Sequence, residues 1–220
     1  LIKTNVYWTS KYLSLCSKIK KLKIFVNIGS SAEYGTQKNE ILSENLTPNP
    51  VSNYAISKDL QSKLVINYAR VYNLPAISVR TFNLIGPSLG ENLVVGKIIK
   101  EFNLFSNSEK SVIEIGRTDS KRDFIDIRDA VRVYSELTQS NCFGKVINVA
   151  RGQSTEIKEI VNICKKVYGN NPEIVSNFIS PKGQDLDFQF ADVSLMNKLV
   201  SNFKFISLEQ SIEDMKNNEK

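Results

Sequence analysis

Short apolar runs alternate with amphipathic stretches along the first half of the chain. Residues 22–31 (LKIFVNIGSS) form an apolar run that ends in Gly and Ser, as a buried strand does. After a polar loop, apolar residues recur every four positions and predict an amphipathic helix that ends near residue 72. Residues 76–87 (AISVRTFNLIGP) predict another strand, closed by Gly86 and Pro87. A strand, a helix and a strand in this order favour a parallel α/β sheet.

The second half of the chain shows similar patterns with less regular spacing. In the helix predicted over residues 126–140, we expect Asp126 to be the N-cap. The helix predicted over residues 154–169 opens with a Ser/Thr cap and stops at Gly169. The remaining predicted elements are helices near 5–15, 92–105, 192–200 and 208–218 and strands at 111–116 and 144–152.

Composition limits the classes of protein that fit. With 220 residues, of which 41% are hydrophobic, the chain can bury a core, and this length allows one domain or two small ones. No apolar run is long enough to cross a bilayer, and the first residues are too polar for a signal peptide. The three cysteines lie far apart without CxxC spacing, which disfavours a disulfide framework or a zinc site. We therefore expect a cytoplasmic protein with no membrane partner.

The net charge of +6 raises the possibility of a nucleic-acid partner. The basic residues are spread along the chain, however, with one short concentration at 18–23 (KIKKLK). A solvated helix end explains that run better than a nucleic-acid patch does. We predict no nucleic-acid partner, and an anionic small-molecule ligand remains open.

The chain contains no histidine. That absence excludes Ser-His-Asp and Cys-His nucleophile systems and every histidine metal site. We expect no metal, and any proton transfer must use Tyr, Lys, Asp, Glu or Cys.

A tyrosine and a lysine four residues apart open the helix that ends near residue 72. The spacing Y-x-x-x-K occurs three times, but only Tyr54 and Lys58 combine a helical context with an upstream strand that ends in hydroxyl residues. An ammonium group one helical turn away favours the phenolate form of a tyrosine, which can then exchange a proton with a sugar hydroxyl or carbonyl. Ser30 or Ser31, at the carboxyl end of that strand, can hydrogen-bond the same oxygen. Spacing alone favours a surface tyrosine with an i,i+4 neighbour over a catalytic pair.

Five longer segments follow one another along the chain: IGSSAEYG, NPVSNYAISKDLQSKLV, AISVRTFNLIGPS, KRDFIDIRDAVRVY and GKVINVARGQSTEIKEIV. Together they resemble the extended short-chain dehydrogenase/reductase family, also described as NAD-dependent epimerases/dehydratases. The resemblance implies a Rossmann-like doubly wound parallel sheet with a small α+β substrate-binding C-terminal portion. In this division, residues 1–85 belong to the NAD(P)-binding domain and 86–220 mainly bind substrate, with 111–150 returning to the sheet. Within the family, IGSSAEYG, RTFNLIGP and RDFIDIRDAVR most resemble GDP-4-dehydro-6-deoxy-D-mannose reductases.

The resemblance implies a role for each matching catalytic residue. Tyr54 would be the acid/base, and Lys58 would stabilise its phenolate and hold the nicotinamide ribose. Ser30 takes the place of the catalytic Ser/Thr, with Ser31 as the alternative if the loop is aligned differently. Thr81 would lie near the nicotinamide of NADP or NAD.

The substrate implied by the resemblance is a nucleotide-diphosphate sugar. Asn83 would contact it, Asn92 and Leu93 would touch the nucleotide, and Arg122 would bind the diphosphate, for which a planar guanidinium is suited. Two simpler interpretations stay open. Asn83 can cap the turn before Gly86 and Pro87, and Arg122 can pair on the surface with Asp123 or Asp126.

Two departures from the family pattern affect the predicted activity. Dehydratases of the family place an acid two residues after the catalytic Ser/Thr, where this chain has Ala32, with Glu33 one step further. This favours reduction of a GDP-4-keto-6-deoxy sugar, or 4-epimerisation, over dehydration. None of the ten glycines forms the glycine-rich turn that holds a cofactor pyrophosphate. We therefore expect an N-terminally truncated Rossmann half, and a non-catalytic fragment that keeps the nucleotide-sugar pocket is the second hypothesis.

The same resemblance implies a homodimer built from two helices of each partner. Leu64, Val65 and Tyr68, on the helix that carries Tyr54, permit such packing.

Overall fold

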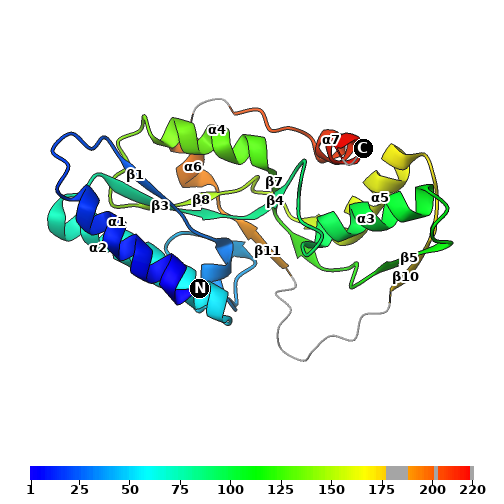
Figure 1. The fold of residues 1–220 in the computed structure, drawn as a ribbon, viewed down its shortest axis with the longest axis horizontal. Coiled ribbons are helices and arrows are strands. Elements are labelled where there is room, and N and C mark those ends of the chain that lie inside the picture. Colours follow the sequence, from blue (N-terminus) through cyan, green and yellow to red (C-terminus); the bar gives the residue numbers. More distant parts are fainter. Residues whose placement is uncertain (177–187, 201–202, 219–220) are drawn as a thin grey trace.

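A three-stranded parallel sheet lies at the centre of the larger lobe (Figure 1). The computed structural model of the chain describes residues 1–176, 188–200 and 203–218. The strand order is β1-β3-β8, and both neighbouring pairs are parallel. The predicted α/β class with a parallel sheet is confirmed. The strands are β1 (Phe25–Ile28), β3 (Ala76–Thr81) and β8 (Val146–Val149).

Helices cover both faces of this sheet, so the sheet is doubly wound. In Figure 1, α1 and α2 lie on one side of the sheet and α4 and α6 on the other. Val65 of α2 and Leu13 of α1 are buried together against Ala76. The helices are η1 (Lys3–Trp8), which is π-helical, α1 (Thr9–Cys16), α2 (Asn53–Tyr72), α4 (Ile127–Leu137) and α6 (Ser194–Leu199).

The long helix α2 has clear start and stop signals. The side chain of Ser52 accepts a hydrogen bond from the Ala55 backbone N–H at 3.1 Å, which caps the first turn. Asn73 ends the helix in the left-handed conformation with φ of 51°, and the predicted end near residue 72 is confirmed. Although α2 spans 20 residues, neither it nor any other described helix is long and apolar enough to cross a membrane.

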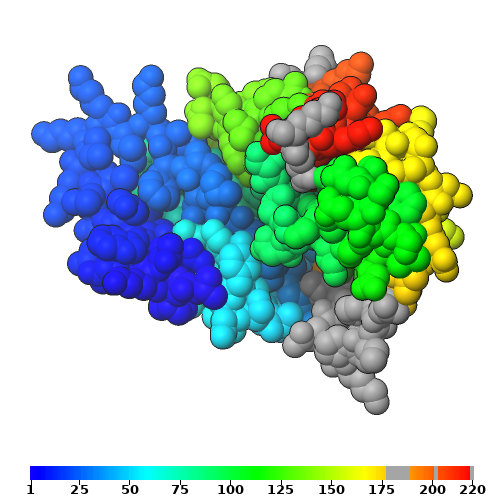
Figure 2. Space-filling model, turned by 45° about the vertical axis from the view of Figure 1, so that its right-hand side comes forward, coloured from blue at the N-terminus to red at the C-terminus, as the bar shows by residue number. Residues whose placement is uncertain are grey.

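A smaller lobe packs three helices beside a two-stranded parallel sheet. Figure 2 shows this lobe, with α3 in green, α5 in yellow and α7 in red, beside the blue N-terminal helices of the larger lobe. Its core is apolar and includes Ile99, Phe102 and Ile160, each fully buried. The elements are α3 (Val94–Ser106), β5 (Val112–Ile115), α5 (Ile157–Tyr168), β10 (Glu173–Ser176) and α7 (Leu208–Asn218).

Short strands connect the two lobes. Two of them form one parallel pair, β4 with β7, and four form a sheet in the order β2-β11-β6-β9. Within residues 111–150, β8 joins the central sheet, whereas β5 pairs with β10. These strands are β2 (Ile41–Leu42), β4 (Asn83–Ile85), β6 (Lys121–Arg122), β7 (Phe124–Asp126), β9 (Thr155–Glu156) and β11 (Phe188–Ala191). In the larger lobe, the short 3-10 helix η2 (Ser31–Tyr34) follows β1 and packs against α2 and β3.

A buried carboxylate ties several of these segments together. Asp123, fully buried between β6 and β7, accepts hydrogen bonds from the backbone N–H groups of Arg151 at 3.0 Å and Gly152 at 2.9 Å. It also accepts one from the Ala191 N–H at 3.1 Å. Backbone donors are strong partners for a carboxylate because the charge of the acceptor strengthens each bond. Asp123 therefore joins the end of β8 to β11.

Two of the predicted helix caps are confirmed and one is wrong. Asp126 accepts a hydrogen bond from the Arg128 N–H at 2.8 Å and caps α4. Gly169 ends α5 in the left-handed conformation. The predicted Ser/Thr cap of α5 is wrong, because the N-cap is Glu156, without a side-chain hydrogen bond. Thr155 lies instead in β9, paired with Arg122 of β6, so sheet pairing takes precedence over capping there.

Candidate active site

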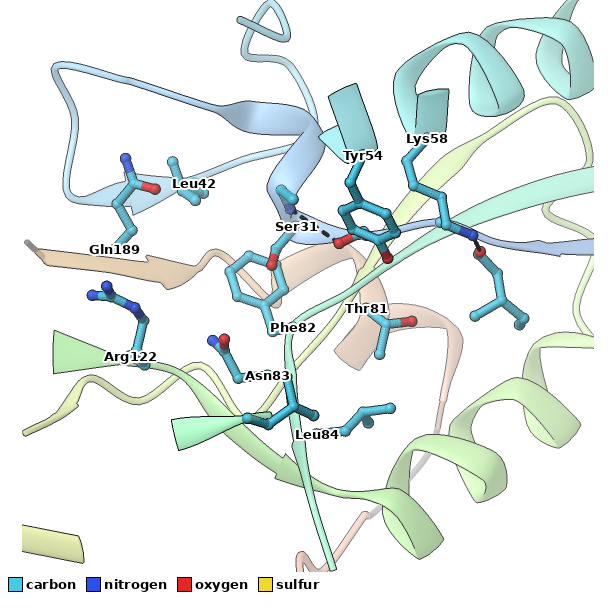
Figure 3. Close-up of a pocket in the computed structure, with 15 residues that line it drawn as sticks. Ser31, Leu42, Tyr54, Lys58, Thr81, Phe82, Asn83, Leu84, Arg122 and Gln189 are labelled. Atoms are coloured by element: carbon cyan, nitrogen blue, oxygen red, sulfur yellow. Dashed lines mark hydrogen bonds between the residues drawn. The ribbon is translucent and has the colours of Figure 1, made fainter. Parts of the chain in front are cut away.

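A cavity of about 520 Å³ opens at the carboxyl ends of β1 and β3. Ligand sites in open parallel sheets form at this end of the strands. Figure 3 shows Tyr54 and Lys58 projecting from α2 over this space, with Thr81 and Asn83 below them and Arg122 and Gln189 on the opposite side. Of the nine residues predicted for the site, eight line the cavity: Ser30, Ser31, Tyr54, Lys58, Thr81, Asn83, Leu93 and Arg122.

Tyr54 and Lys58 reach the cavity from the first two turns of α2. Residues four apart lie on the same face of a helix, so the Ser52 cap that fixes the first turn also fixes the direction of both side chains. Tyr54 is 43% exposed and lines the cavity, so a ligand there can reach its side chain. A proton on its hydroxyl group is therefore accessible to a ligand.

The Lys58 ammonium is held at the end of β1. Its Nζ donates hydrogen bonds to the Ile28 carbonyl oxygen at 2.8 Å and to Gln61 Oε1 at 3.1 Å. Burial lowers the pKa of Lys58, and the Glu33 carboxylate opposes this shift. Three donors on an ammonium leave a third hydrogen for a ligand in the cavity.

The two serines occupy the turn that follows β1. The Ser30 side chain accepts a hydrogen bond from the Ala32 N–H at 3.2 Å, and Ser31 begins the short helix η2. The Glu33 carboxylate accepts the Ser30 backbone N–H at 2.9 Å and completes a capping box. Both hydroxyl groups therefore sit in a turn of fixed geometry beside the cavity.

Glu33 itself lies away from the cavity, in the core under α2. Its side chain is fully buried, and Oε2 accepts a hydrogen bond from Arg80 Nε at 3.0 Å. The Ser62 hydroxyl donates to Oε1 at 3.0 Å. Burial raises the pKa of Glu33, although the Arg80 guanidinium acts in the opposite direction. A side chain at Gly29 would collide with Glu33 Oε1, so this turn requires a glycine.

Thr81 and Asn83 line the floor of the cavity. The Thr81 hydroxyl lies 2.6 Å from the Tyr134 hydroxyl, and burial raises the pKa of that tyrosine. Asn83 Nδ2 donates to the Asp123 carbonyl oxygen at 3.0 Å. The Asn83 amide is thus fixed by the β6–β7 connection and does not merely cap the turn before Gly86.

The far wall holds the residues expected to face the nucleotide sugar. Leu93, the N-terminal boundary residue of α3, and Arg122 of β6 line the cavity, whereas Asn92 is exposed and is not among the lining residues. Asp126, offered as a surface partner of Arg122, pairs instead with Arg128 at 2.8 Å.

Sequence reasoning missed one polar residue of the cavity. Gln189 of β11 lies directly beside Arg122, because β11 pairs with β6 in that register. No local pattern around Gln189 predicts this, since the pairing joins segments 67 positions apart in the chain. The capping role of Glu33 could have been predicted, because Ser-x-x-Glu over residues 30–33 is the sequence signature of a capping box.

The arrangement combines a tyrosine hydroxyl, a half-buried ammonium and two serine hydroxyls at one end of a cavity, with a guanidinium at the other. The first group of side chains can deliver a proton to a polarised oxygen. The guanidinium suits a diphosphate.

Comparison with known proteins places the chain in a family. The sequence profile of the GDP-mannose 4,6 dehydratase family matches residues 1–189. GDP-6-deoxy-D-talose 4-dehydrogenase of Aggregatibacter actinomycetemcomitans is 29% identical over 186 residues, which are 84% of this chain and 61% of that protein. GDP-6-deoxy-D-mannose reductase of Pseudomonas aeruginosa is 28% identical over 156 residues, 70% of this chain and 51% of that protein. The chain thus spans between one half and two thirds of the length of these relatives.

Solved structures share the fold. The NADPH complex of RMD from Pseudomonas aeruginosa matches 99% of this chain and 73% of that one, with a TM-score of 0.90 at 22% identity. UDP-glucuronic acid 4-epimerase from Bacillus cereus, in complex with UDP-glucuronic acid and NAD, matches 99% of this chain and 67% of that one, with a TM-score of 0.86 at 25% identity. With the family profile covering most of the sequence, the chain belongs to the GDP-mannose 4,6 dehydratase family of extended short-chain dehydrogenases/reductases.

Proposed function

We propose that the chain carries the catalytic and nucleotide-sugar-binding residues of an NAD(P)-dependent oxidoreductase that reduces the 4-keto group of a GDP-4-keto-6-deoxy sugar. The observation that supports this most is the single cavity into which α2, the turn after β1 and β6 bring Tyr54, Lys58, both serines and Arg122. Curated relatives that act on GDP-linked 6-deoxy sugars support the choice of substrate class.

In the proposed reaction Tyr54 donates its hydroxyl proton to the ketone oxygen. The Ser30 or Ser31 hydroxyl donates a hydrogen bond to that oxygen, which orients it and stabilises developing negative charge. The Lys58 ammonium stabilises the phenolate left on Tyr54. A bound NAD(P)H supplies the hydride that reduces the carbonyl carbon.

The residues present fit the nicotinamide end of such a cofactor. Lys58 Nζ keeps a donor for ribose hydroxyls after its bonds to Ile28 and Gln61, and Thr81 lies on the floor beside it. The ten glycines include no glycine-rich turn for the pyrophosphate. We assign residues 1–85 to the cofactor side of the site, and residues 86–220 mainly to the substrate side, with β8 in the sheet of the first part.

At the substrate side Arg122 is proposed to bind the diphosphate, with Asn83 contacting the sugar. Leu93 and Asn92 are proposed to contact the nucleotide, Asn92 from the rim because it is exposed.

Reduction is favoured over dehydration by the identity and direction of two side chains. Ala32 lines the cavity at the position where family dehydratases carry an acid, so no carboxylate is available there. Glu33 is buried and bonded to Arg80, which removes it from that role. A 4-epimerase of the same family uses the same tyrosine and stays an alternative. A non-catalytic fragment that keeps the sugar-nucleotide pocket is the other, because the chain spans only part of its relatives.

The proposal is tested by separating binding from turnover. GDP-mannose binding is measured by calorimetry, and NADPH-dependent reduction of GDP-4-keto-6-deoxymannose is followed by absorbance. Tyr54→Phe should lower turnover by about 10²–10⁴-fold and leave GDP-mannose affinity unchanged. Arg122→Gln should weaken GDP-mannose binding about tenfold, while Lys158→Gln, on an exposed face of α5, should change neither quantity.

Other outcomes would contradict the proposal or favour one of the alternatives. Full turnover by Tyr54→Phe would remove the proposed proton donor. Binding without turnover would favour the non-catalytic pocket, and redox-neutral sugar interconversion would favour the epimerase. Failure to bind GDP-mannose would overturn the assignment of the cavity.

We also propose a homodimer that packs α1 and α2 against those of a second copy. Of the predicted positions, Val65 is fully buried, and Leu64 and Tyr68 are partly buried against the chain's own core. Exposed apolar side chains lie nearby instead, on η1, α1 and α2: Tyr7, Trp8, Tyr12, Leu15, Ile56 and Leu60. Sedimentation equilibrium should give twice the 24.8 kDa chain mass, and Trp8→Glu with Leu60→Glu should give the monomer.

A cytoplasmic location stays a prediction. The cysteines Cys16, Cys142 and Cys164 are free thiols, as a reducing compartment requires.

A further inference from the structure

The carboxylate of Glu33 is fully buried and accepts three hydrogen bonds, although it does not line the cavity. Oε1 accepts the Ser30 backbone N–H at 2.9 Å and the Ser62 hydroxyl at 3.0 Å. Oε2 accepts Arg80 Nε at 3.0 Å. Burying a carboxylate costs free energy unless the charge is paired and hydrogen-bonded, as it is here. The mechanism proposed above does not use this carboxylate.

The hydrogen bonds that lead to Glu33 from the centre of the sheet all run in one direction. Because the Ser62 proton goes to Glu33, the Ser78 hydroxyl donates to the Ser62 oxygen. Asn27 Nδ2 donates to Ser78 in turn. Glu33 accepts at the end of this chain of donors, so an ionised carboxylate fits every bond that it makes.

The bond from the Ser30 N–H connects this buried carboxylate to the candidate active site. Ser30 lines the cavity, and its hydroxyl oxygen accepts the Ala32 N–H at 3.2 Å. No described residue accepts the Ser30 hydroxyl proton, which leaves that proton for a ligand oxygen in the cavity. A hydroxyl group that already accepts a hydrogen bond is polarised and donates more strongly.

The backbone just before Ser30 is held by other bonds. The Gly29 N–H donates to β3 at 2.7 Å, and the Ile28 carbonyl oxygen accepts from Lys58 at 2.8 Å. A side chain at Gly29 would collide with Glu33 Oε1, so the carboxylate packs directly on this turn. The end of β1 is therefore fixed as far as Gly29, and the bond to Glu33 extends that order to Ser30.

We propose that Glu33 is a positioning residue of the candidate active site, whose carboxylate holds the Ser30 backbone so that the Ser30 hydroxyl donates to the substrate ketone. The inference rests on the proposed function, which supplies the identity of the ketone. Glu33 acts through Ser30, since it does not line the cavity itself. Arg80 balances the charge that this role requires in the core.

Two double variants test this role. Both carry Arg80→Met together with a neutral residue at position 33, so neither leaves a buried charge without its partner. Glu33→Gln keeps an oxygen that can accept the Ser30 N–H, whereas Glu33→Leu has no acceptor. The glutamine variant is thus the matched control for the leucine variant, and urea unfolding checks that both are folded.

The first readout is hydrogen exchange of the Ser30 amide by NMR, which requires no turnover. Measured relative to the amides of β3, this exchange should be at least tenfold faster in the leucine variant than in the glutamine variant.

The second readout is kcat for NADPH-dependent reduction of GDP-4-keto-6-deoxymannose. It should be at least tenfold lower in the leucine variant, because a misplacement of about 1 Å can lower a rate about 10²-fold. The affinities of the two variants for GDP-mannose should agree within twofold.

A third comparison separates positioning from stability. In a Ser30→Ala background the leucine and glutamine variants should have equal kcat, because Glu33 then has no hydroxyl group to orient. A purely structural role would lower kcat by the same factor with or without the Ser30 hydroxyl.

Three results would overturn the proposal: equal exchange of the Ser30 amide in the two variants, equal kcat, or a difference in kcat that persists in the Ser30→Ala background. Failure of the proposed function has a different signature. If the unaltered chain does not reduce the ketone, the proposed function is wrong, and exchange of the Ser30 amide alone decides whether Glu33 holds this turn.

Discussion

The two faces of the central sheet are packed in opposite ways. On β3, Ile77 and Val79 point into an apolar cluster with α4 and α6. Ser78 and Arg80, the residues that alternate with them, point toward α2 and are equally buried. A parallel strand covered on both faces is usually apolar throughout. Here the middle of one strand is apolar on the face toward α4, through Ile77 and Val79, and polar on the face toward α2, through Ser78 and Arg80.

The polar face forms a continuous set of hydrogen bonds. Asn27 donates to Ser78 at 2.8 Å, and the Ser78 hydroxyl lies 2.8 Å from that of Ser62. Ser62 in turn donates to Glu33, the partner of Arg80. These bonds end at the turn that holds Ser30.

The set continues on the other side of Arg80. Its guanidinium lies 4.4 Å from the centre of the Tyr34 ring, whose hydroxyl donates to Asn148 Oδ1 at 2.7 Å. Apolar packing tolerates volume-conserving changes, whereas a buried polar set requires every member to keep its partner. The comparison teaches that the α4 face contributes burial, and the α2 face fixes the geometry of the turn beside the cavity.

The largest effect on the polar face should come from removing the buried guanidinium of Arg80. Arg80→Met should lower the free energy of unfolding by about 3–5 kcal/mol, because Glu33 is left as an uncompensated buried charge. Urea unfolding measures this, with Arg70→Met on the exposed face of α2 as the control. Adding Glu33→Leu to Arg80→Met should restore part of the loss. Equal effects at 80 and 70 would show that the ion pair does not matter.

Two small substitutions, one on each face of β3, sharpen the comparison, and the first is on the polar face. Ser78→Ala removes the oxygen that Asn27 and Ser62 share. The substitution leaves the Asn27 Nδ2 donor unpaired and removes the donor to the Ser62 oxygen, whose own proton goes to Glu33. This should cost about 1–3 kcal/mol in the free energy of unfolding. Thermal unfolding measured by calorimetry is the check. A neutral substitution would mean that the two partners satisfy each other without Ser78.

The matched change on the apolar face should be the mildest. Ile77→Val removes one methylene from the cluster under α4 and should cost about 0.5–1.5 kcal/mol. The same calorimetric scan, run beside Ser78→Ala, gives the ratio of the two effects. A larger loss for Ile77→Val would reverse our ranking of the two faces.

Much of the fold could be predicted from sequence because its main elements carry their own periodicity. α2 has a Ser cap and an asparagine end within 22 residues. Its four-residue apolar repeat predicts the helix but not its buried face, because Ile56 and Leu60 of that repeat are exposed. The two-residue strands β2, β6 and β9 contain no such pattern. They exist only through pairing with distant segments, as when β11 pairs with β2. Pairing between distant strands also explains why the predicted Ser/Thr cap of α5 is wrong, since Thr155 of β9 pairs with Arg122 of β6.

The candidate site was predictable to the extent that its residues lie in motifs at strand and helix ends. Tyr54, Lys58 and the two serines lie together at the cavity, and their catalytic roles stay predictions. Gln189 could not be predicted, because its place depends on the pairing of β11 with β6. The buried role of Glu33 depends on Arg80, which lies 47 positions away in the chain.

The hydrogen bonds that Asp123 accepts from three backbone N–H groups have a consequence for the lifetime of the native state. Its carboxylate joins residues 28, 29 and 68 positions further along the chain. Contacts between such distant segments incur a loop-closure entropy cost, so we expect them to form after the rate-limiting step of folding. Interactions absent from that transition state act on the unfolding rate. Asp123 should therefore slow unfolding without affecting folding. We expect Asp123→Asn to accelerate unfolding in stopped-flow experiments and to leave the refolding rate almost unchanged.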